Sequence, residues 1–129
     1  MKTVAIIPAG GAGRRINAGT AKQYLLLDEL PVLVHCLKVF EQTAVIDEII
    51  LAVPGSDIKF VREELIEKNN LKKVAKIIAG GAERQDSVQN ALAALTDECD
   101  IILVHDGVRP FVTRDMINRV AEETTGNRE

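Results

Sequence analysis

The sequence predicts an α/β fold: a Rossmann-like, doubly wound, mostly parallel sheet with helices on both faces. Three observations lead to this prediction. Short runs rich in β-branched residues are expected to form buried strands at Thr3–Pro8, Ile49–Val53, Val74–Ala79 and Ile101–His105. Segments with helical periodicity separate these runs, which is typical of right-handed βαβ crossovers. The strands are continuously apolar rather than alternating, which indicates a parallel sheet covered on both faces.

The helices are predicted from apolar residues spaced three and four apart. Their expected core positions are Leu33, Cys36, Leu37 and Phe40 in the first, Ile58, Val61 and Leu65 in the second, Val88, Ala91, Leu92 and Leu95 in the third, and Ile117, Val120 and Ala121 in the fourth. The third is expected to run from about Glu83 to Leu95. We expect Pro31 at the first position of the first helix, Ser56 or Asp57 as cap of the second, and Thr113 as cap of the fourth.

Composition restricts the class of protein. The 129 residues fit one domain (1–129), and 47% hydrophobic with 27% charged residues is typical of globular chains. A formal net charge of −3 argues against a nucleic-acid-binding protein. No apolar run is long enough for a membrane span, and the first apolar run is too short for a signal peptide. Cys36 and Cys99 are expected to be reduced and structural, so the predicted location is the cytoplasm.

Three polar or glycine-rich segments follow predicted strands, at residues 8–15, 80–84 and 106–110. In an open parallel sheet, ligands bind beyond the carboxyl ends of the strands, where the strand order reverses. We therefore expect these segments to meet at one edge and form a binding site.

The first segment predicts a phosphate-binding loop. Its glycines let backbone N–H groups approach phosphate oxygens, and Arg14 and Arg15 add charge and forked donors. The dinucleotide-binding fingerprint fails because Ile16 occupies the position of its last glycine, and because the second strand ends at Pro54 without a ribose-binding acid. The P-loop motif fails because the sequence contains no Gly-Lys pair.

Other candidates lie nearby in the sequence. Lys22 is expected to act as a point charge on a phosphoryl group. Asp106, directly after the fourth strand, is expected either to bind Mg²⁺ beside phosphates or to cap a turn. Arg84 and Ser87 share one face at a helix start, although Ser87 also fits a first-turn hydroxyl. His35 is expected to be structural, and His105 fits either a structural histidine or a site residue.

These segments together resemble a known family. The blocks that carry the resemblance are residues 8–15, Lys22-Gln23-Tyr24-Leu25, residues 80–88 and residues 105–111. Their order and spacing resemble 2-C-methyl-D-erythritol 4-phosphate cytidylyltransferase, in its N-terminal portion. The resemblance implies a nucleotide-diphospho-sugar transferase fold. It also implies transfer of CMP from CTP to methylerythritol phosphate, with release of pyrophosphate, in non-mevalonate isoprenoid biosynthesis.

The resemblance also implies roles for single residues. Arg15 and Lys22 would be catalytic and stabilise charge at the α-phosphorus, and Asp106 would bind Mg²⁺. The residues implied in nucleotide binding are Pro8, Ala9, Gly10, Gly11, Ala12, Gly13, Gly81, Ala82, Arg84, Ser87, Asp106, Gly107 and Arg109. The implied partners are CTP and a polyol phosphate, with a homodimer for the full-length protein and neither nucleic acid nor membrane.

Alternatives stay open at this point. Gly10, Gly107 and Val108 depart from the small alanines common in the family, and Gly and Val there also occur in ribitol-5-phosphate cytidylyltransferases. The block 85–88 and Tyr24 favour the methylerythritol enzyme. Another sugar-phosphate nucleotidyltransferase is a further alternative. Because the family's domain continues past Glu129, we expect a domain truncated at its C-terminal side, with poor turnover by itself. A non-catalytic nucleotide-binding fragment is therefore an alternative of another class.

Overall fold

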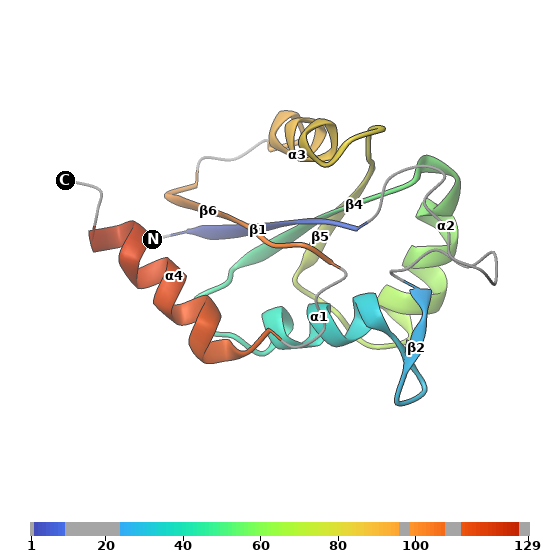
Figure 1. Ribbon diagram of the computed structural model, residues 1–129, viewed down its shortest axis with the longest axis horizontal. Helices are drawn as coiled ribbons and strands as arrows, with labels where there is room; N and C mark the ends of the chain where they lie inside the picture. The colour runs from blue at the N-terminus through green and yellow to red at the C-terminus, as the bar shows by residue number, and fades with distance from the viewer. Residues whose placement is uncertain (1, 10–23, 96–98, 108–111, 127–129) are drawn as a thin grey trace.

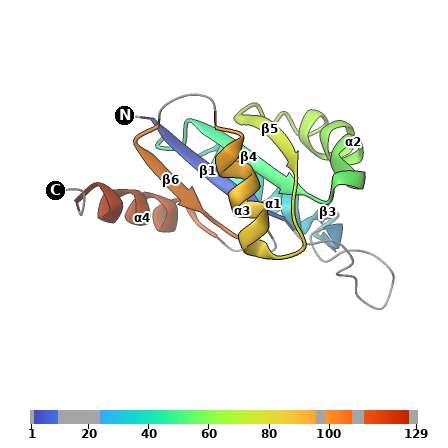
Figure 2. The same cartoon turned by 90° about the horizontal axis from the view of Figure 1, so that it is seen from above.

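The computed structural model describes residues 2–9, 24–95, 99–107 and 112–126. Its main sheet has the strand order β5-β4-β1-β6, with every neighbouring pair parallel. The strands are β1 (Thr3–Pro8), β4 (Glu48–Val53), β5 (Val74–Ala79) and β6 (Ile101–Val104), which lie side by side in Figure 2. This confirms the predicted fold class. The chain builds outward from β1 through β4 to β5 and then crosses to the other side of β1, so the strand order reverses between β1 and β6.

Helices cover both faces of this sheet (Figure 1). On one face lie α1 (Val32–Glu41), the helix formed by α2 (Ile58–Phe60) and the π-helical η3 (Val61–Glu67), and α4 (Arg114–Gly126). A short 3₁₀ turn, η2 (Gly55–Asp57), precedes α2. The opposite face carries α3 (Arg84–Ala93). Within the described ranges, no helix combines the length and hydropathy needed to cross a bilayer.

The burial of the central strand β1 explains why its sequence is almost continuously apolar. Its six residues are all buried. Ala5 and Ile7 join the larger core cluster with α1, η3 and α4, whereas Val4 and Ile6 join a smaller cluster that includes Ala91 of α3. Because both faces of β1 are covered, alternation of polar and apolar residues would bury polar side chains.

The prediction of core positions is wrong for two residues. Leu92 is 41% exposed and Val120 is 49% exposed. Within the described residues α3 has no neighbouring helix on its face of the sheet, and the residues it buries are Ser87 and Ala91. On α4 the buried stripe is likewise narrow and contains Ile117 and Ala121. A helix at the margin of a core buries fewer positions than its apolar periodicity predicts.

The helix starts match the predictions in part. The hydroxyl of Thr113 accepts the N–H of Met116 at 3.2 Å, which confirms Thr113 as a cap. Pro31 lies just before α1, at its cap position rather than its first helical position. Asp57 occupies the N-cap position of α2, as one of the two expected caps, but its side chain makes no capping hydrogen bond. The Asp57 carboxylate instead accepts the Tyr24 hydroxyl at 2.8 Å.

A small hairpin that the sequence did not predict precedes α1. Its strands are β2 (Leu26–Leu27) and β3 (Leu30–Pro31), paired antiparallel. The two turn residues are Asp28 at φ 51° and Glu29 at φ 69°, both in the left-handed region. The ring of His35 on α1 bonds to the carbonyl of Leu27, which supports its expected structural role. The hairpin is therefore attached to α1 beside its turn, and the two turn residues are strained.

The replacement Glu29→Gly is expected to stabilise the fold. A left-handed backbone costs a non-glycine residue about 1–2 kcal/mol, and glycine removes that cost. Glycine also has more freedom in the unfolded chain, which offsets part of the stabilisation. We expect the free energy of unfolding to rise by about 0.5–1 kcal/mol, measured by urea titration. Glu29→Ala is the control, since it removes the carboxylate but keeps the Cβ. An equal gain from both variants would show that charge, not backbone strain, is the cause.

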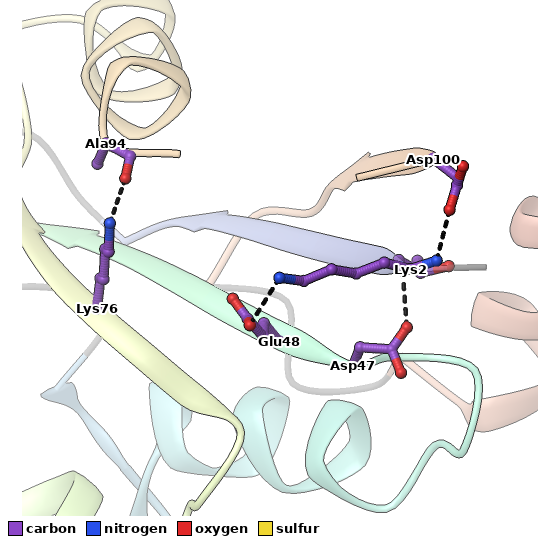
Figure 3. A network of polar contacts seen from close by, with 7 residues as sticks. Lys2, Asp47, Glu48, Lys76, Ala94 and Asp100 are labelled. Atoms are coloured by element: carbon purple, nitrogen blue, oxygen red, sulfur yellow. Dashed lines mark hydrogen bonds and ion pairs between the residues drawn. The ribbon is translucent and has the colours of Figure 1, made fainter. Parts of the chain in front are cut away.

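The amino edge of the sheet is held by a polar network (Figure 3). The carboxylate of Asp100 accepts the backbone N–H of Lys2, and that of Asp47 accepts the N–H of Thr3, each at 2.7 Å. The ammonium of Lys2 pairs with Glu48 at 2.9 Å. These bonds satisfy the backbone N–H groups of Lys2 and Thr3 at the start of β1. They also join β1 to β4 and to the residue before β6.

Candidate functional site at the carboxyl edge

Backbone hydrogen bonds continue past the strand ends and join the predicted site segments. The N–H of Gly107 donates to Pro8 O at 2.9 Å, and the N–H of Ala9 donates to Ala52 O at 2.8 Å. The N–H of Gly80 donates to Val53 O at 2.7 Å. The segments after β6, β1, β4 and β5 are thereby linked in one row along the carboxyl edge. The structure thus brings the described parts of the three predicted segments together, as expected for a binding edge of this fold.

Arg84 and Asp106 meet at this edge from different segments. Arg84 opens α3 after the β5 segment, and Asp106 follows β6. The guanidinium Nε lies 3.9 Å from Asp106 Oδ2, with the two side chains 56% and 32% exposed. An ion pair this long and exposed contributes little to stability. Both charges therefore remain accessible to a ligand that carries phosphates or a metal ion.

Ser87 organises the segment that precedes α3. Its buried hydroxyl accepts the N–H of Gly81 at 3.1 Å. A Cβ added to Gly80 would lie 2.6 Å from the same oxygen. A side chain at Gly80 therefore does not fit unless Ser87 moves. The hydroxyl predicted to bind nucleotide also fixes the loop beside it.

Two residues that sequence analysis did not assign to the site support the same loop. The Asp86 carboxylate accepts the N–H of Glu83 at 3.2 Å, and the Asn90 amide donates to Ala79 O at 3.2 Å. The structure forms a capping box between Glu83 and Asp86, but these residues lack the Ser/Thr and Glu/Gln of the usual sequence signature, so Asp86 gave no clear signal. Asn90 gives no local signal, because its partner Ala79 lies in β5, a different element. Together they fix the end of β5 and the start of α3.

Gly107 fills a confined position between β1 and α1. A Cβ placed there would lie 3.0 Å from both the Ala9 Cβ and the Leu33 Cδ1, and 3.2 Å from the Ile7 Cγ2. Glycine, rather than the alanine expected from the family, therefore suits the close packing at position 107 of this chain. The turn after β6 lies on the end of β1, with Gly107 beside Pro8 and Ala9.

The side chains of His105 and Cys36 lie next to this turn and pack on the core side of it. His105 donates its backbone N–H to Ile6 O at 3.0 Å, and its ring packs on Phe40 with centroids 5.4 Å apart. This packing fits the structural alternative for His105. The Cys36 thiol lies 3.9 Å from the carbonyl of Asp106. Burial raises the pKa of Cys36 from 9.0 to about 12, with a smaller contribution from the Asp106 charge.

The Cys36 thiol is expected to resist alkylation. At pH 8 it is protonated in the folded chain and inaccessible, so iodoacetamide should modify the half-buried Cys99 first and Cys36 only after denaturation. Peptide mass mapping measures this order. Because the folded pKa is raised, the fold keeps this proton while the unfolded chain loses it, and stability falls only as pH rises above about 9 toward 12. Rapid labelling of Cys36 in the folded chain at pH 8 would contradict the expectation.

Several predicted site residues lie outside the described residues, and their roles stay predictions. These are Gly10, Gly11, Ala12, Gly13, Arg15, Lys22 and Arg109. Pro8, Ala9, Gly81, Ala82, Arg84, Ser87, Asp106 and Gly107 are described, and all lie at the end of a strand or at the start of α3.

Asp106 is the predicted metal ligand. Across the part of the chain that the structure describes, no group of three or more His, Cys, Asp or Glu side chains could hold a metal ion. A site made by protein alone is therefore absent from that part. Mg²⁺ is commonly held by one or two carboxylates together with substrate phosphates. The partly exposed Asp106 carboxylate fits that kind of shared site.

Comparison with known proteins agrees with this arrangement. A family model described as 2-C-methyl-D-erythritol 4-phosphate cytidylyltransferase matches residues 3–129. A protein of that name from Syntrophus aciditrophicus is 50% identical over 121 residues, covering 94% of this chain and 52% of the relative. One from Geobacter metallireducens is 46% identical over 130 residues, covering 98% and 56%. The chain spans about half the length of the curated relatives it matches.

Solved structures agree as well. The 4-diphosphocytidyl-2C-methyl-D-erythritol synthase of Anaerococcus prevotii superposes with a TM-score of 0.81 at 28% identity, covering 98% of this chain and 52% of that one. A Mycobacterium tuberculosis protein solved in complex with manganese has a TM-score of 0.73 at 23% identity, covering 98% and 61%. The second likeness shows the fold alone.

Proposed function

Since the chain belongs to the 2-C-methyl-D-erythritol 4-phosphate cytidylyltransferase family, we propose that it forms the nucleotide-binding part of an enzyme that makes CDP-methylerythritol. In that reaction a phosphate oxygen of methylerythritol phosphate attacks the α-phosphorus of CTP. A new P–O bond forms, the bond to the β-phosphate oxygen breaks, and pyrophosphate leaves. The observation that carries the proposal is the row of backbone contacts that gathers the predicted nucleotide segments at one sheet edge.

The roles of the site residues follow from this chemistry. The attacking phosphate is already anionic, so no general base is needed, and positioning with charge neutralisation remains. Arg15 and Lys22 neutralise charge at the α-phosphorus. Ser87 and Gly81 bind the cytidine, and Arg84 lies where it can reach a nucleotide at the same edge.

The divalent cation is part of the proposal. Asp106 would hold Mg²⁺ together with phosphate oxygens of CTP, and the ion would supply positive charge beside the triphosphate. Because a carboxylate repels phosphates, Asp106 at this edge is easier to explain with a cation beside it. We extend the proposal to a cytoplasmic homodimer that acts on two small molecules, without nucleic-acid or membrane partners.

The experiment compares acceptors. CTP and Mg²⁺ are given to the protein that carries this sequence, with methylerythritol phosphate or ribitol 5-phosphate, and pyrophosphate release is measured. We expect release with methylerythritol phosphate and none without Mg²⁺. Faster turnover on ribitol 5-phosphate would overturn the acceptor assignment. Binding of CTP without turnover on any polyol phosphate would favour a non-catalytic nucleotide-binding fragment.

A further inference from the structure

The hydrogen-bond ladder between β1 and β6 continues beyond the last residue of β6. In the parallel register of the two strands, Ile6 pairs with Val104. The N–H of His105 then donates to Ile6 O at 3.0 Å, and the N–H of Gly107 donates to Pro8 O at 2.9 Å. The chain that follows β6 therefore still lies along β1 at Gly107.

Side chains alternate along this stretch as they do in a strand. Leu103 belongs to the core cluster that includes α1, and the ring of His105 packs on a phenylalanine of the same helix. Asp106 instead approaches Arg84, the first residue of α3, on the opposite face of the sheet. Alternation therefore places Gly107 on the α1 side of the strand and the Asp106 carboxylate on the α3 side.

Leu33 occupies the space that a side chain at position 107 would need. It lies in the first turn of α1 and is fully buried. Its Cδ1 would lie 3.0 Å from a Cβ added to Gly107, and the two other nearest atoms belong to Ala9 and Ile7. The Ala9 Cβ and the Ile7 Cγ2 are attached close to the backbone, whereas the Leu33 Cδ1 is the tip of a longer side chain. Leu33 and Gly107 therefore form a pair matched in size, the 33–107 pair.

Position 107 matters for the chemistry of the site because Asp106 precedes it directly. The Arg84 guanidinium lies 3.9 Å from the carboxylate, too far to hold it firmly. The place of the carboxylate therefore depends on the backbone that carries it, which the bond from Gly107 to Pro8 ties to β1. Mg²⁺ tolerates little departure from octahedral geometry, so a small shift of one ligand weakens its binding.

We propose that Leu33 is a positioning residue for Asp106. Its side chain, matched to the glycine at position 107, sets how closely the chain after β6 packs on β1 and α1, and so where the carboxylate meets the cation. The inference rests on the proposed function for the metal role of Asp106. The 33–107 pair itself rests only on packing, and it predicts that the sizes of the two residues can be changed only together.

The 33–107 pair is tested first without any ligand. Gly107→Ala adds one carbon and Leu33→Val removes one, so the double variant keeps the total volume of the pair. Each single variant should lower the melting temperature, and the double variant should regain most of the loss. Leu37→Val is the matched control, because Leu37 is equally buried on α1 but supplies none of the three atoms nearest to the added Cβ. It should not restore Gly107→Ala, and losses that simply add in the 33–107 double variant would overturn the pair.

Binding of CTP then tests positioning. By isothermal titration calorimetry with Mg²⁺, Gly107→Ala should weaken CTP binding roughly tenfold, the scale of losing one contact to a charged group. With EDTA in place of Mg²⁺ the affinity should change little, because the loss falls on the cation. Addition of Leu33→Val should restore the affinity measured with Mg²⁺. Equal weakening with and without Mg²⁺, or no recovery in the double variant, would overturn the positioning role.

Asp106→Asn shows whether the effect passes through the carboxylate. In that background Gly107→Ala should cause no further loss of CTP affinity with Mg²⁺, since both changes act on one ligand of the cation. Losses that multiply would overturn the link from Leu33 to Asp106. An unaltered protein that does not bind CTP would overturn the proposed function and with it the metal role, whereas the melting temperatures would still judge the 33–107 pair.

Discussion

Replacing Lys22 with alanine is expected to lower kcat for pyrophosphate release about a hundredfold, the scale of removing one preorganised charge-stabilising group. Negative charge increases around the α-phosphorus as the acceptor phosphate attacks, and an ammonium aimed there acts mainly on the transition state. KM for CTP should change far less than kcat. Arg15→Ala is expected to lower kcat by a similar factor, since the guanidinium would stabilise the same negative charge at the α-phosphorus. Steady-state kinetics over a range of CTP concentrations measure both effects.

Lys72→Ala provides the control for charge removal. Lys72 is exposed just before β5, at the amino edge, far from the predicted phosphate site. Its replacement changes the net charge by the same amount and should leave kcat unchanged. Near-normal turnover in Lys22→Ala would remove Lys22 from catalysis. An equal loss in Lys72→Ala would assign the effect to overall charge.

The sheet could be predicted because its strands carry their own signal. Two of the four, Thr3–Pro8 and Val74–Ala79, match the predicted bounds, and the other two differ by one residue at an end. A strand covered on both faces must be apolar throughout, and that requirement is visible in the sequence itself. The hairpin before α1 had no such signal. Its strands have two residues each, and its turn residues Asp28 and Glu29 lack the glycine that usually marks a positive φ.

The candidate site could be predicted as a set of segments but not as a set of contacts. The rule that parallel strands end at one edge placed Ala9, Arg84 and Asp106 together without coordinates. The bond between Tyr24 and Asp57 joins residues 33 apart, and the sequence instead suggested that Asp57 caps a helix. A short polar side chain has several possible partners. Which one it takes depends on tertiary packing that local patterns do not contain.

Replacing Gly81 with alanine is expected to damage the predicted nucleotide-binding segment after β5 severely. A Cβ there would lie 2.2 Å from the Asp86 Cβ and 3.2 Å from its Cγ, well inside contact distance. Asp86 cannot simply rotate away, because its Cβ is fixed to the first turn of α3. The loop or the helix start must shift, which breaks the bond from the Gly81 N–H to Ser87. We expect about 1–3 kcal/mol less stability, typical of overpacking, and at least a roughly tenfold loss of CTP affinity.

Gly55→Ala is the matched control for this variant, at the same edge of the sheet. A Cβ at Gly55 would lie 3.5 Å from the Ala79 Cβ, an ordinary van der Waals distance. It should therefore leave both stability and CTP affinity nearly unchanged, measured by thermal unfolding and isothermal titration calorimetry with Mg²⁺ present. If Gly81→Ala unfolded like the control but bound CTP weakly, the loop geometry alone would account for the loss. If both variants bound CTP equally well, the segment after β5 would not read the nucleotide, and Ser87 would be only a structural hydroxyl at the start of α3.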